Sequence, residues 1–137
     1  MQIILDTSVL YSLINKKDGN HKKTKDFFLH NDDACYILPS TLLTEICYLL
    51  RTKLSPYIEI KFLQEINKSF NLEIPKDEDI IRIIEILKKY EDLNIGYVDA
   101  SIVAIAERLR INKILTLDRK HFEVVVPRGF DNFDILI

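Results

Sequence analysis

The chain has 137 residues and a formal net charge of −2 at pH 7, a length that suits one domain with a sizeable hydrophobic core. Hydrophobic residues make up 47% of the sequence and charged residues 29%, a balance that excludes a disordered chain. We therefore expect residues 1–137 to form a single domain. No apolar run approaches the roughly 20 residues of a membrane span. Cys35 and Cys47 form no CxxC pair, so a cytoplasmic protein with reduced thiols is expected.

Short apolar runs alternate with amphipathic segments along the chain. The runs predict strands at 2–5, 34–38, 70–74, 114–117 and 133–137. Apolar residues at helical spacing predict helices that begin near residues 7, 21, 40, 56, 77 and 97. This alternation favours an α/β fold with a mostly parallel central sheet and helices on both faces. In such sheets, ligands bind beyond the carboxyl ends of the strands, at a switch point in the strand order.

The segment 96–109 carries the most informative helix pattern. It places apolar side chains on one stripe, namely Val98, Ile102, Ile105, Ala106 and Leu109, and puts Asp99 in the first turn. The helix dipole favours a carboxylate at this end. A carboxylate that faces an apolar stripe nevertheless needs a partner, because an unpaired buried charge costs several kcal/mol.

Three further acids also lie next to predicted apolar segments. Asp6 and Asp118 each follow a predicted strand, and Glu45 lies on the helix stripe formed by Leu42 and Leu49. Taken singly, Asp6 or Asp118 could be a turn or N-cap residue, Asp99 could cap its helix, and Glu45 could be a half-exposed helix residue. Together the four acids predict a cluster in which the carboxylates cannot all stay ionised without a cation. An all-oxygen ligand set, with no His or Cys expected near it, favours Mg²⁺ or Mn²⁺ over zinc.

Four segments resemble the PIN-domain family and, within it, the compact ribonuclease toxins of the VapC type. They are Ile4-Leu5-Asp6-Thr7-Ser8-Val9-Leu10, Thr44-Glu45-Ile46, Val98-Asp99-Ala100-Ser101-Ile102-Val103-Ala104-Ile105-Ala106 and Ile114-Leu115-Thr116-Leu117-Asp118-Arg119-Lys120-His121-Phe122. The resemblance implies a three-layer α/β/α fold and a metal-dependent endoribonuclease. It places Asp6, Glu45, Asp99 and Asp118 on the family's acidic positions and Thr116 on its supporting hydroxyl position. Some members carry a further acid after the last one, where this chain has Arg119 and Lys120.

Within such a site we expect Asp6, Asp99 and Asp118 to bind the metal and Glu45 to hold a water or act as general base. Thr116, Thr7 and Ser8 are expected to hydrogen-bond ligand carboxylates, although Thr7 and Ser8 could equally be N-cap residues. The residues expected to contact substrate phosphates are Arg119, Lys120, His121, Lys16 and Lys17. The alternative reading of these cationic residues is a solvated surface. A histidine-based cleavage mechanism is disfavoured because the three histidines are far apart in the sequence.

The resemblance further implies an RNA substrate, a small antitoxin protein as partner and a homodimer. The net charge does not exclude RNA, because four metal-bound acids would leave the rest of the chain net positive. Two alternatives remain open at this level. One is a PIN-like module that binds RNA or protein without cutting, and the other is a PIN nuclease in RNA processing outside any toxin–antitoxin system.

Overall fold

The computed structural model describes all residues from Met1 to Ile137 and contains one five-stranded sheet in which all neighbouring strands are parallel. The strands lie in the order β3-β2-β1-β4-β5. Their bounds are β1 Gln2–Leu5, β2 Cys35–Pro39, β3 Asn71–Glu73, β4 Lys113–Leu115 and β5 Asp134–Leu136. The predicted α/β class is therefore confirmed, and the sheet is wholly parallel rather than mostly so.

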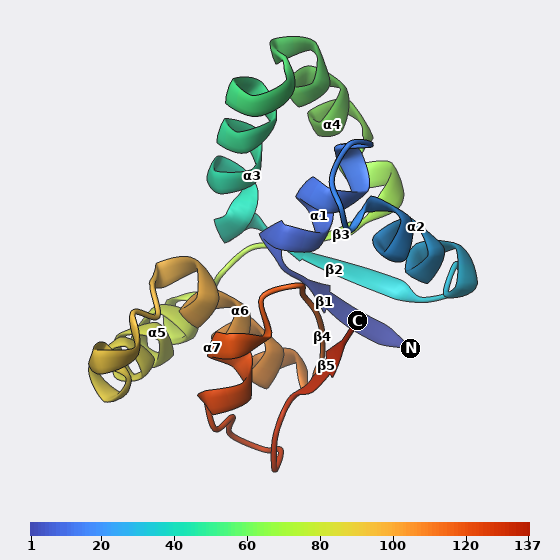
Figure 1. Cartoon of the computed structure of the whole chain (residues 1–137). Helices are drawn as coiled ribbons and strands as arrows, with labels where there is room; N and C mark the ends of the chain where they lie inside the picture. The colour runs from blue at the N-terminus through green and yellow to red at the C-terminus, as the bar shows by residue number, and fades with distance from the viewer.

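Seven α-helices cover the two faces of this sheet. They are α1 Thr7–Ile14, α2 His21–His30, α3 Leu43–Leu49, α4 Pro56–Ser69, α5 Asp77–Lys89, α6 Tyr97–Leu109 and α7 Arg119–Val124. Short 3₁₀ turns, η1 Ser40–Leu42 and η3 Glu91–Leu93, precede α3 and α6, and a π-helical turn, η2 Leu50–Leu54, joins α3 to α4. Figure 1 shows α1 to α4 on one side of the sheet and α5 to α7 on the other. The expected three-layer α/β/α arrangement is present. None of the helices combines the length and apolar character that crossing a bilayer requires.

The strand order places a switch point between β1 and β4, because the chain builds outward from β1 in both directions. Ile4 pairs with Ile37 of β2 on one side and with Ile114 of β4 on the other. The two loops that leave the carboxyl ends of β1 and β4 are therefore neighbours, and the backbone N–H of Asp6 donates to the carbonyl of Leu115 at 3.2 Å. In open parallel sheets this is where ligands bind.

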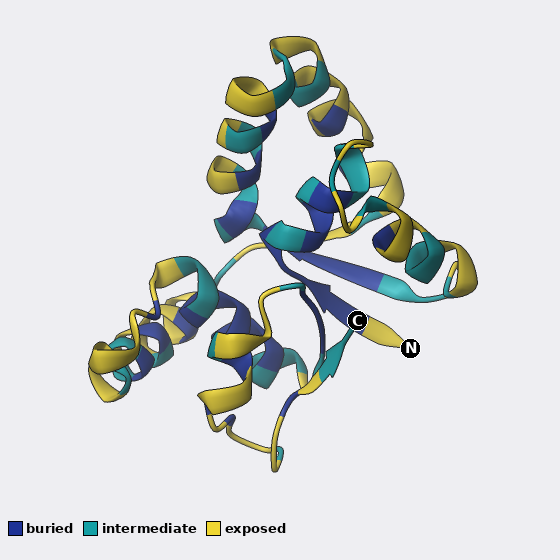
Figure 2. Cartoon of the chain, viewed as in Figure 1, coloured by how far each residue is buried: buried dark blue, intermediate teal, exposed yellow.

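Helix α6 forms the centre of one outer layer. Three residues of the predicted stripe, Ile102, Ile105 and Ala106, are buried, whereas Val98 and Leu109 at its ends are half-buried. Val103 and Ala104, outside that stripe, are buried as well. Figure 2 shows this burial along most of α6, whereas the outward faces of α4 and α5 are exposed. The helix is apolar on most sides because it lies between the sheet and a second helix, α5.

Two sequence predictions about element bounds are wrong. The predicted strand 114–117 ends at Leu115, because Thr116 Oγ1 accepts a hydrogen bond from the N–H of Asp118 and turns the chain. The chain then enters α7, which is not predicted because its six residues contain only two apolar side chains, Phe122 and Val124. The sequence also has no apolar periodicity there that would mark a helix.

The helical spacing of Ile80, Ile83, Ile84 and Leu87 predicts one apolar stripe along α5, and this prediction is partly wrong. Ile80 and Ile84 have exposed fractions of 41% and 47%. The buried side of α5 instead carries Ile83, Ile86 and the carboxylate of Asp79. This acid can face inward because it has a cationic partner on α6.

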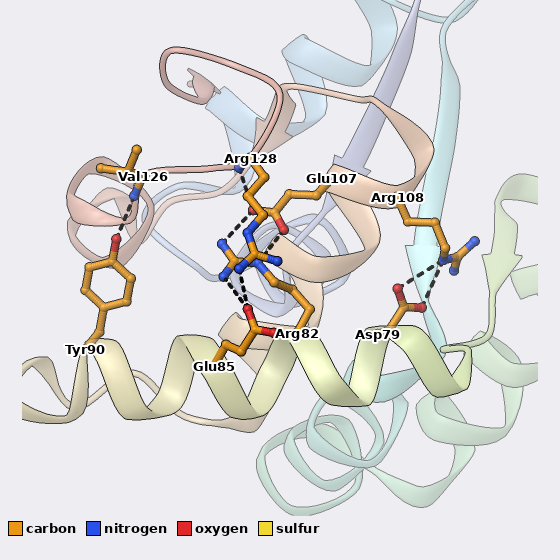
Figure 3. A network of polar contacts seen from close by, with 8 residues as sticks. All are labelled: Asp79, Arg82, Glu85, Tyr90, Glu107, Arg108, Val126 and Arg128. Carbon is orange, nitrogen blue, oxygen red and sulfur yellow. Dashed lines mark hydrogen bonds and ion pairs between the residues drawn. The ribbon is translucent and has the colours of Figure 1, made fainter.

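A network of ion pairs fixes α5 against α6 (Figure 3). Arg108 Nε lies 3.0 Å from both carboxylate oxygens of Asp79, and its Nη2 lies 2.8 Å from Glu73 at the end of β3. Asp79 also accepts from the N–H of Lys76 at 2.8 Å and so caps its own helix. One turn away, Arg82 makes a bidentate contact to Glu107, at 2.7 and 3.0 Å. Two-point contacts of this kind fix the rotation of α6 as well as its position.

We predict that Arg108→Ala lowers the free energy of unfolding by about 3 kcal/mol, because Asp79 would keep a buried charge without its cation. Urea unfolding followed by circular dichroism measures the change. Lys22→Ala is the control, since its pair with Asp26 is on the surface and is expected to contribute at most about 0.5 kcal/mol. Equal effects of the two substitutions would contradict the assigned role of Arg108.

Candidate active site

The four predicted acids come from four elements that meet at the switch point. Asp6 caps α1, Glu45 lies in the first turn of α3, Asp99 lies in the first turn of α6, and Asp118 precedes α7. Their charges act on one another: Asp6 and Asp99 both raise the pKa of Glu45, Asp99 raises that of Asp6, and Asp118 raises that of Asp99. Each of the four carboxylates therefore lies within electrostatic range of at least one other, and we refer to the four as the acidic group.

Asp6 is the most enclosed of the four acids. Its carboxylate accepts from the N–H of Thr7 at 2.7 Å, from Ser8 Oγ at 3.1 Å and from Thr116 Oγ1 at 2.7 Å. Only 5% of its surface is exposed. Burial raises its pKa, the Asp99 charge adds to that rise, and the three hydrogen bonds oppose it. The three hydrogen bonds thus fix the orientation of the Asp6 carboxylate, while burial leaves its negative charge poorly solvated.

The hydroxyl groups of Ser8 and Thr116 connect the two loops of the switch point. They lie 3.3 Å apart, and Ser8 Oγ also accepts from the N–H of Leu117 at 3.0 Å. The carboxylate that Thr116 binds is Asp6, on the neighbouring strand, rather than Asp118, two residues further on. Thr7 contacts Asp6 through its backbone, and its buried side-chain oxygen has no partner within hydrogen-bond distance.

Asp99 has a partner that the sequence did not indicate. His121 Nδ1 lies 2.6 Å from Asp99 Oδ2, and both side chains are largely buried, with 19% and 24% of their surfaces exposed. Burial raises the pKa of Asp99, the His121 hydrogen bond lowers it, and the Asp118 charge raises it. The expectation that no histidine lies near the acids is therefore wrong. The physical reason is α7, the helix that the sequence did not predict, which turns His121 back towards α6.

Glu45 and Asp118 lie at the open side of the group. Glu45 is exposed, so the expectation that it points inward along an apolar stripe is wrong. Partial burial still raises its pKa, as do the charges of Asp6 and Asp99. The 3₁₀ turn before its helix, η1, contacts α6 through a hydrogen bond of 2.5 Å between the hydroxyls of Thr41 and Ser101. Asp118 is exposed as well and makes no capping bond with its side chain.

The donor set suits a hard cation in its chemistry, but the side chains do not form a closed ligand set. The structure contains no group of three or more His, Cys, Asp or Glu side chains arranged to hold a metal ion. The available donors are carboxylate oxygens, with the unpaired Thr7 hydroxyl beside them. Oxygen donors of this kind favour Mg²⁺ or Mn²⁺. Because Glu45 and Asp118 are exposed, their side chains can rotate towards Asp6 and Asp99 without disturbing the core.

The cationic residues expected to bind substrate differ from one another in their contacts and exposure. Arg119 pairs with Glu123 at 3.1 Å and donates to the carbonyls of Ile135 and Ile137, so it fixes α7 to the end of the chain. Lys120 and Lys17 are exposed. Lys16 instead borders an apolar groove between α1 and α4.

This groove has a volume of about 500 Å³. Its walls come from α1 and from the segment that runs from Ser55 to the end of α4. The apolar residues that line it are Leu10, Leu13, Ile14, Tyr57, Ile58, Phe62 and Phe70, and its polar rim includes Lys16, Lys61 and Glu65. The groove lies on the α1–α4 side of the sheet and is separate from the acidic group.

Fold and site together define an α/β protein with an anionic site at the switch point of a parallel sheet. The family model described as PIN domain matches residues 3–126, a range that includes all four acids. The chain belongs to the PIN-domain family.

Individual relatives agree with this assignment. The chain is 30% identical over 135 residues to Ribonuclease VapC26 of Mycobacterium tuberculosis, covering 98% of this chain and 99% of that protein. The structure is similar to that of VapC20 of Mycobacterium tuberculosis, a Sarcin-Ricin loop cleaving toxin, with a TM-score of 0.73, 18% identity and coverage of 82% and 86%. VapBC2 of Rickettsia felis, bound to a DNA fragment from its promoter, matches with a TM-score of 0.73, 16% identity and full coverage of both chains. At these identities the structural matches show a shared fold.

We predict that Asp6→Asn stabilises the metal-free protein at pH 7, because Asn can still cap α1 but carries no charge. The pKa of Asp6 is raised above its ordinary value of 3.8, so the folded state binds the proton more tightly than the unfolded state. The destabilising charge is fully present above the raised pKa and is lost as the pH falls through it. The gain should therefore shrink from pH 7 towards pH 4 in urea unfolding experiments. Asp131→Asn, in an exposed loop, should show no such trend.

Proposed function

We propose that this protein is a Mg²⁺- or Mn²⁺-dependent endoribonuclease that hydrolyses RNA phosphodiester bonds. The observation that carries the proposal is the approach of Asp6, Glu45, Asp99 and Asp118 at the switch point, where neighbouring carboxylates raise the pKa of Asp6, Glu45 and Asp99. Four such acids destabilise a protein unless a cation or cationic ligand offsets them. A module that only bound RNA would gain nothing from keeping them together.

Each acid has a role that follows from its surroundings. Asp6, oriented by three donors, and Asp99, oriented by His121, would be the principal ligands, and Asp118 would complete the set. A bound divalent ion supplies a water of lowered pKa and stabilises negative charge on the phosphate. Glu45, exposed and with a raised pKa, would accept a proton from that water or hold it in line with the phosphorus. Thr116, Ser8 and Thr7 would keep Asp6 in place as the charges change.

The choice of RNA rests on the relatives and on the surface. The relative that matches along almost its full length is named a ribonuclease. Exposed Lys120 lies two residues after Asp118, so it would reach a phosphate next to the scissile one. Lys16 lies just beyond the far end of α1, roughly 12 Å from Asp6 at about 1.5 Å per residue, and would contact the backbone further along together with Lys17.

We further propose that the protein is the toxin of a toxin–antitoxin pair and that an antitoxin binds the groove between α1 and α4. Several structures of the same fold are toxin–antitoxin complexes, including one from Klebsiella pneumoniae. An apolar groove with a charged rim suits an amphipathic helix. A nuclease of RNA processing outside such a pair would have no need of this groove, which favours the toxin.

The remaining expectations belong to the same proposal. Exposed Tyr48, Ile60 and Leu63 on α3 and α4 would serve a homodimer contact. One hydrophobic cluster of 28 buried residues runs from Ile3 to Phe133, which supports a single domain over residues 1–137. Two free cysteines fit a cytoplasmic protein.

The proposed nuclease activity predicts that Asp99→Asn lowers the rate of RNA cleavage by at least about 100-fold and that EDTA abolishes cleavage. The products should carry a 5′-phosphate and a 3′-hydroxyl, because a metal-activated water attacks phosphorus. Sequencing of the RNA ends after induced expression reports substrate, position and end chemistry together. Products with a 2′,3′-cyclic phosphate would falsify the mechanism, and full activity in EDTA would contradict the metal requirement.

The proposed antitoxin groove predicts that Leu13→Arg weakens binding of the proposed antitoxin by roughly tenfold or more, while RNA cleavage by the isolated chain is unchanged. Leu13 lines the groove and is only half-buried, so the substitution leaves the core intact. Isothermal titration calorimetry measures the affinity. Ile74→Arg, at an exposed position outside the groove, should bind normally, and an equal loss in both variants would count against the groove.

A further inference from the structure

Asp99 and Asp6 are held in very different ways. The Asp6 carboxylate accepts three hydrogen bonds, from one backbone N–H and two hydroxyls. The Asp99 carboxylate accepts one, at Oδ2, from His121. Its other neighbours within the group are carboxylates that repel it. Without the histidine, repulsion would favour rotation of the Asp99 side chain away from the other three acids.

From this contrast we propose that His121 is the positioning residue of Asp99, fixing its carboxylate for cation binding through the Nδ1–Oδ2 hydrogen bond. The inference rests on the proposed function and deepens it, since it concerns the same site. An ionised carboxylate only accepts hydrogen bonds, so the proton lies on Nδ1. The bond occupies Oδ2 and leaves Oδ1 as the oxygen available to a cation. A partner that orients a ligand carboxylate in this way strengthens metal binding.

The helix that carries His121 is itself well anchored, which a positioning role requires. Phe122 of α7 is 2% exposed and belongs to the hydrophobic core. Arg119 ties the first turn of α7 to the carbonyls of Ile135 and Ile137. The hydrogen bond of 2.6 Å therefore joins α6 to an element whose position is fixed independently.

The same bond links two acids of the site. Asp118 immediately precedes α7, and the loop before it is held by the hydrogen bond from the N–H of Asp118 to Thr116 Oγ1, at 2.9 Å. His121 thus joins the element that begins at Asp118 to the carboxylate of Asp99. Loss of the bond would release Asp99 and loosen its spacing from Asp118. A role in contacting substrate phosphate would not require Nδ1 to be committed to Asp99.

Two substitutions at this position separate the hydrogen bond from the packing of the ring. His121→Phe keeps a ring of similar shape and removes the donor. His121→Asn removes the ring but places an amide nitrogen where Nδ1 branches from Cγ, so the donor is kept. His30→Phe is the matched control, because His30 Nδ1 contacts the carbonyl of Asp26 on the exposed side of α2.

The test is the affinity of the metal-free protein for Mn²⁺, measured by isothermal titration calorimetry and by the rise in melting temperature. His121→Phe should weaken Mn²⁺ binding by about 10- to 100-fold, whereas His121→Asn and His30→Phe should stay close to the parent. Unchanged Mn²⁺ binding in His121→Phe would overturn the proposal. Tighter binding would overturn it too, because it would show that His121 competes with the cation for Asp99. Equal losses in His121→Phe and His121→Asn would also overturn it, because ring packing alone would then explain them.

Asp99→Asn distinguishes this proposal from the proposed function. If Asp99→Asn loses Mn²⁺ binding and His121→Phe does not, only the positioning role fails. If Asp99→Asn binds Mn²⁺ like the parent, the proposed metal site fails as well.

A second measurement uses the parent chain and does not depend on how His121 variants fold. Long-range ¹H–¹⁵N spectra should show the His121 proton on Nδ1, and in Asp99→Asn it should move towards Nε2. A proton on Nε2 in the parent would contradict the hydrogen bond.

Discussion

The repulsion among four carboxylates is the constraint on which the rest of this structure depends. A parallel sheet with a switch point between β1 and β4 brings two strand ends together, and each end delivers an acid. Helices α3 and α6 add one acid each from opposite layers. The residues around the four acids compensate for this concentration of charge. Hydrogen-bond donors hold the buried Asp6, and His121 binds Asp99. Glu45 and Asp118 face solvent.

The ion pairs between α5 and α6 contribute to the site from a distance. Asp99 lies at one end of α6, and Arg108 at the other end binds Asp79 and Glu73. Because α6 is apolar on most sides, packing alone would allow it to slide or rotate between the sheet and α5. Directional contacts at its charged end restrict that freedom, and so they help to define where Asp99 meets the other acids.

The acidic group and the apolar groove occupy separate parts of the molecule and have different physical characters. The acidic group combines two strand ends with the first turns of two helices, and electrostatics dominates its character. The groove lies between α1 and α4 and offers an apolar surface with a charged rim. Helix α1 belongs to both, since its first residue contacts Asp6 and its last turns line the groove. A partner in the groove would therefore contact the helix that Asp6 caps.

The sequence by itself determined the fold class and the family and indicated four acids as candidate site residues, because these depend on local periodicity and on short motifs around Asp6, Asp99 and Asp118. It also indicated that Thr116 would bind a carboxylate, though not that the carboxylate would be Asp6. Only the tertiary structure decided that Glu45 is exposed, that α5 turns Asp79 inward towards Arg108, and that His121 binds Asp99. Each of these outcomes depends on a partner distant in sequence: 29 residues separate Asp79 from Arg108 and 22 separate Asp99 from His121. Periodicity within one element carries no information about such partners, so their pairing appears only when the elements pack together.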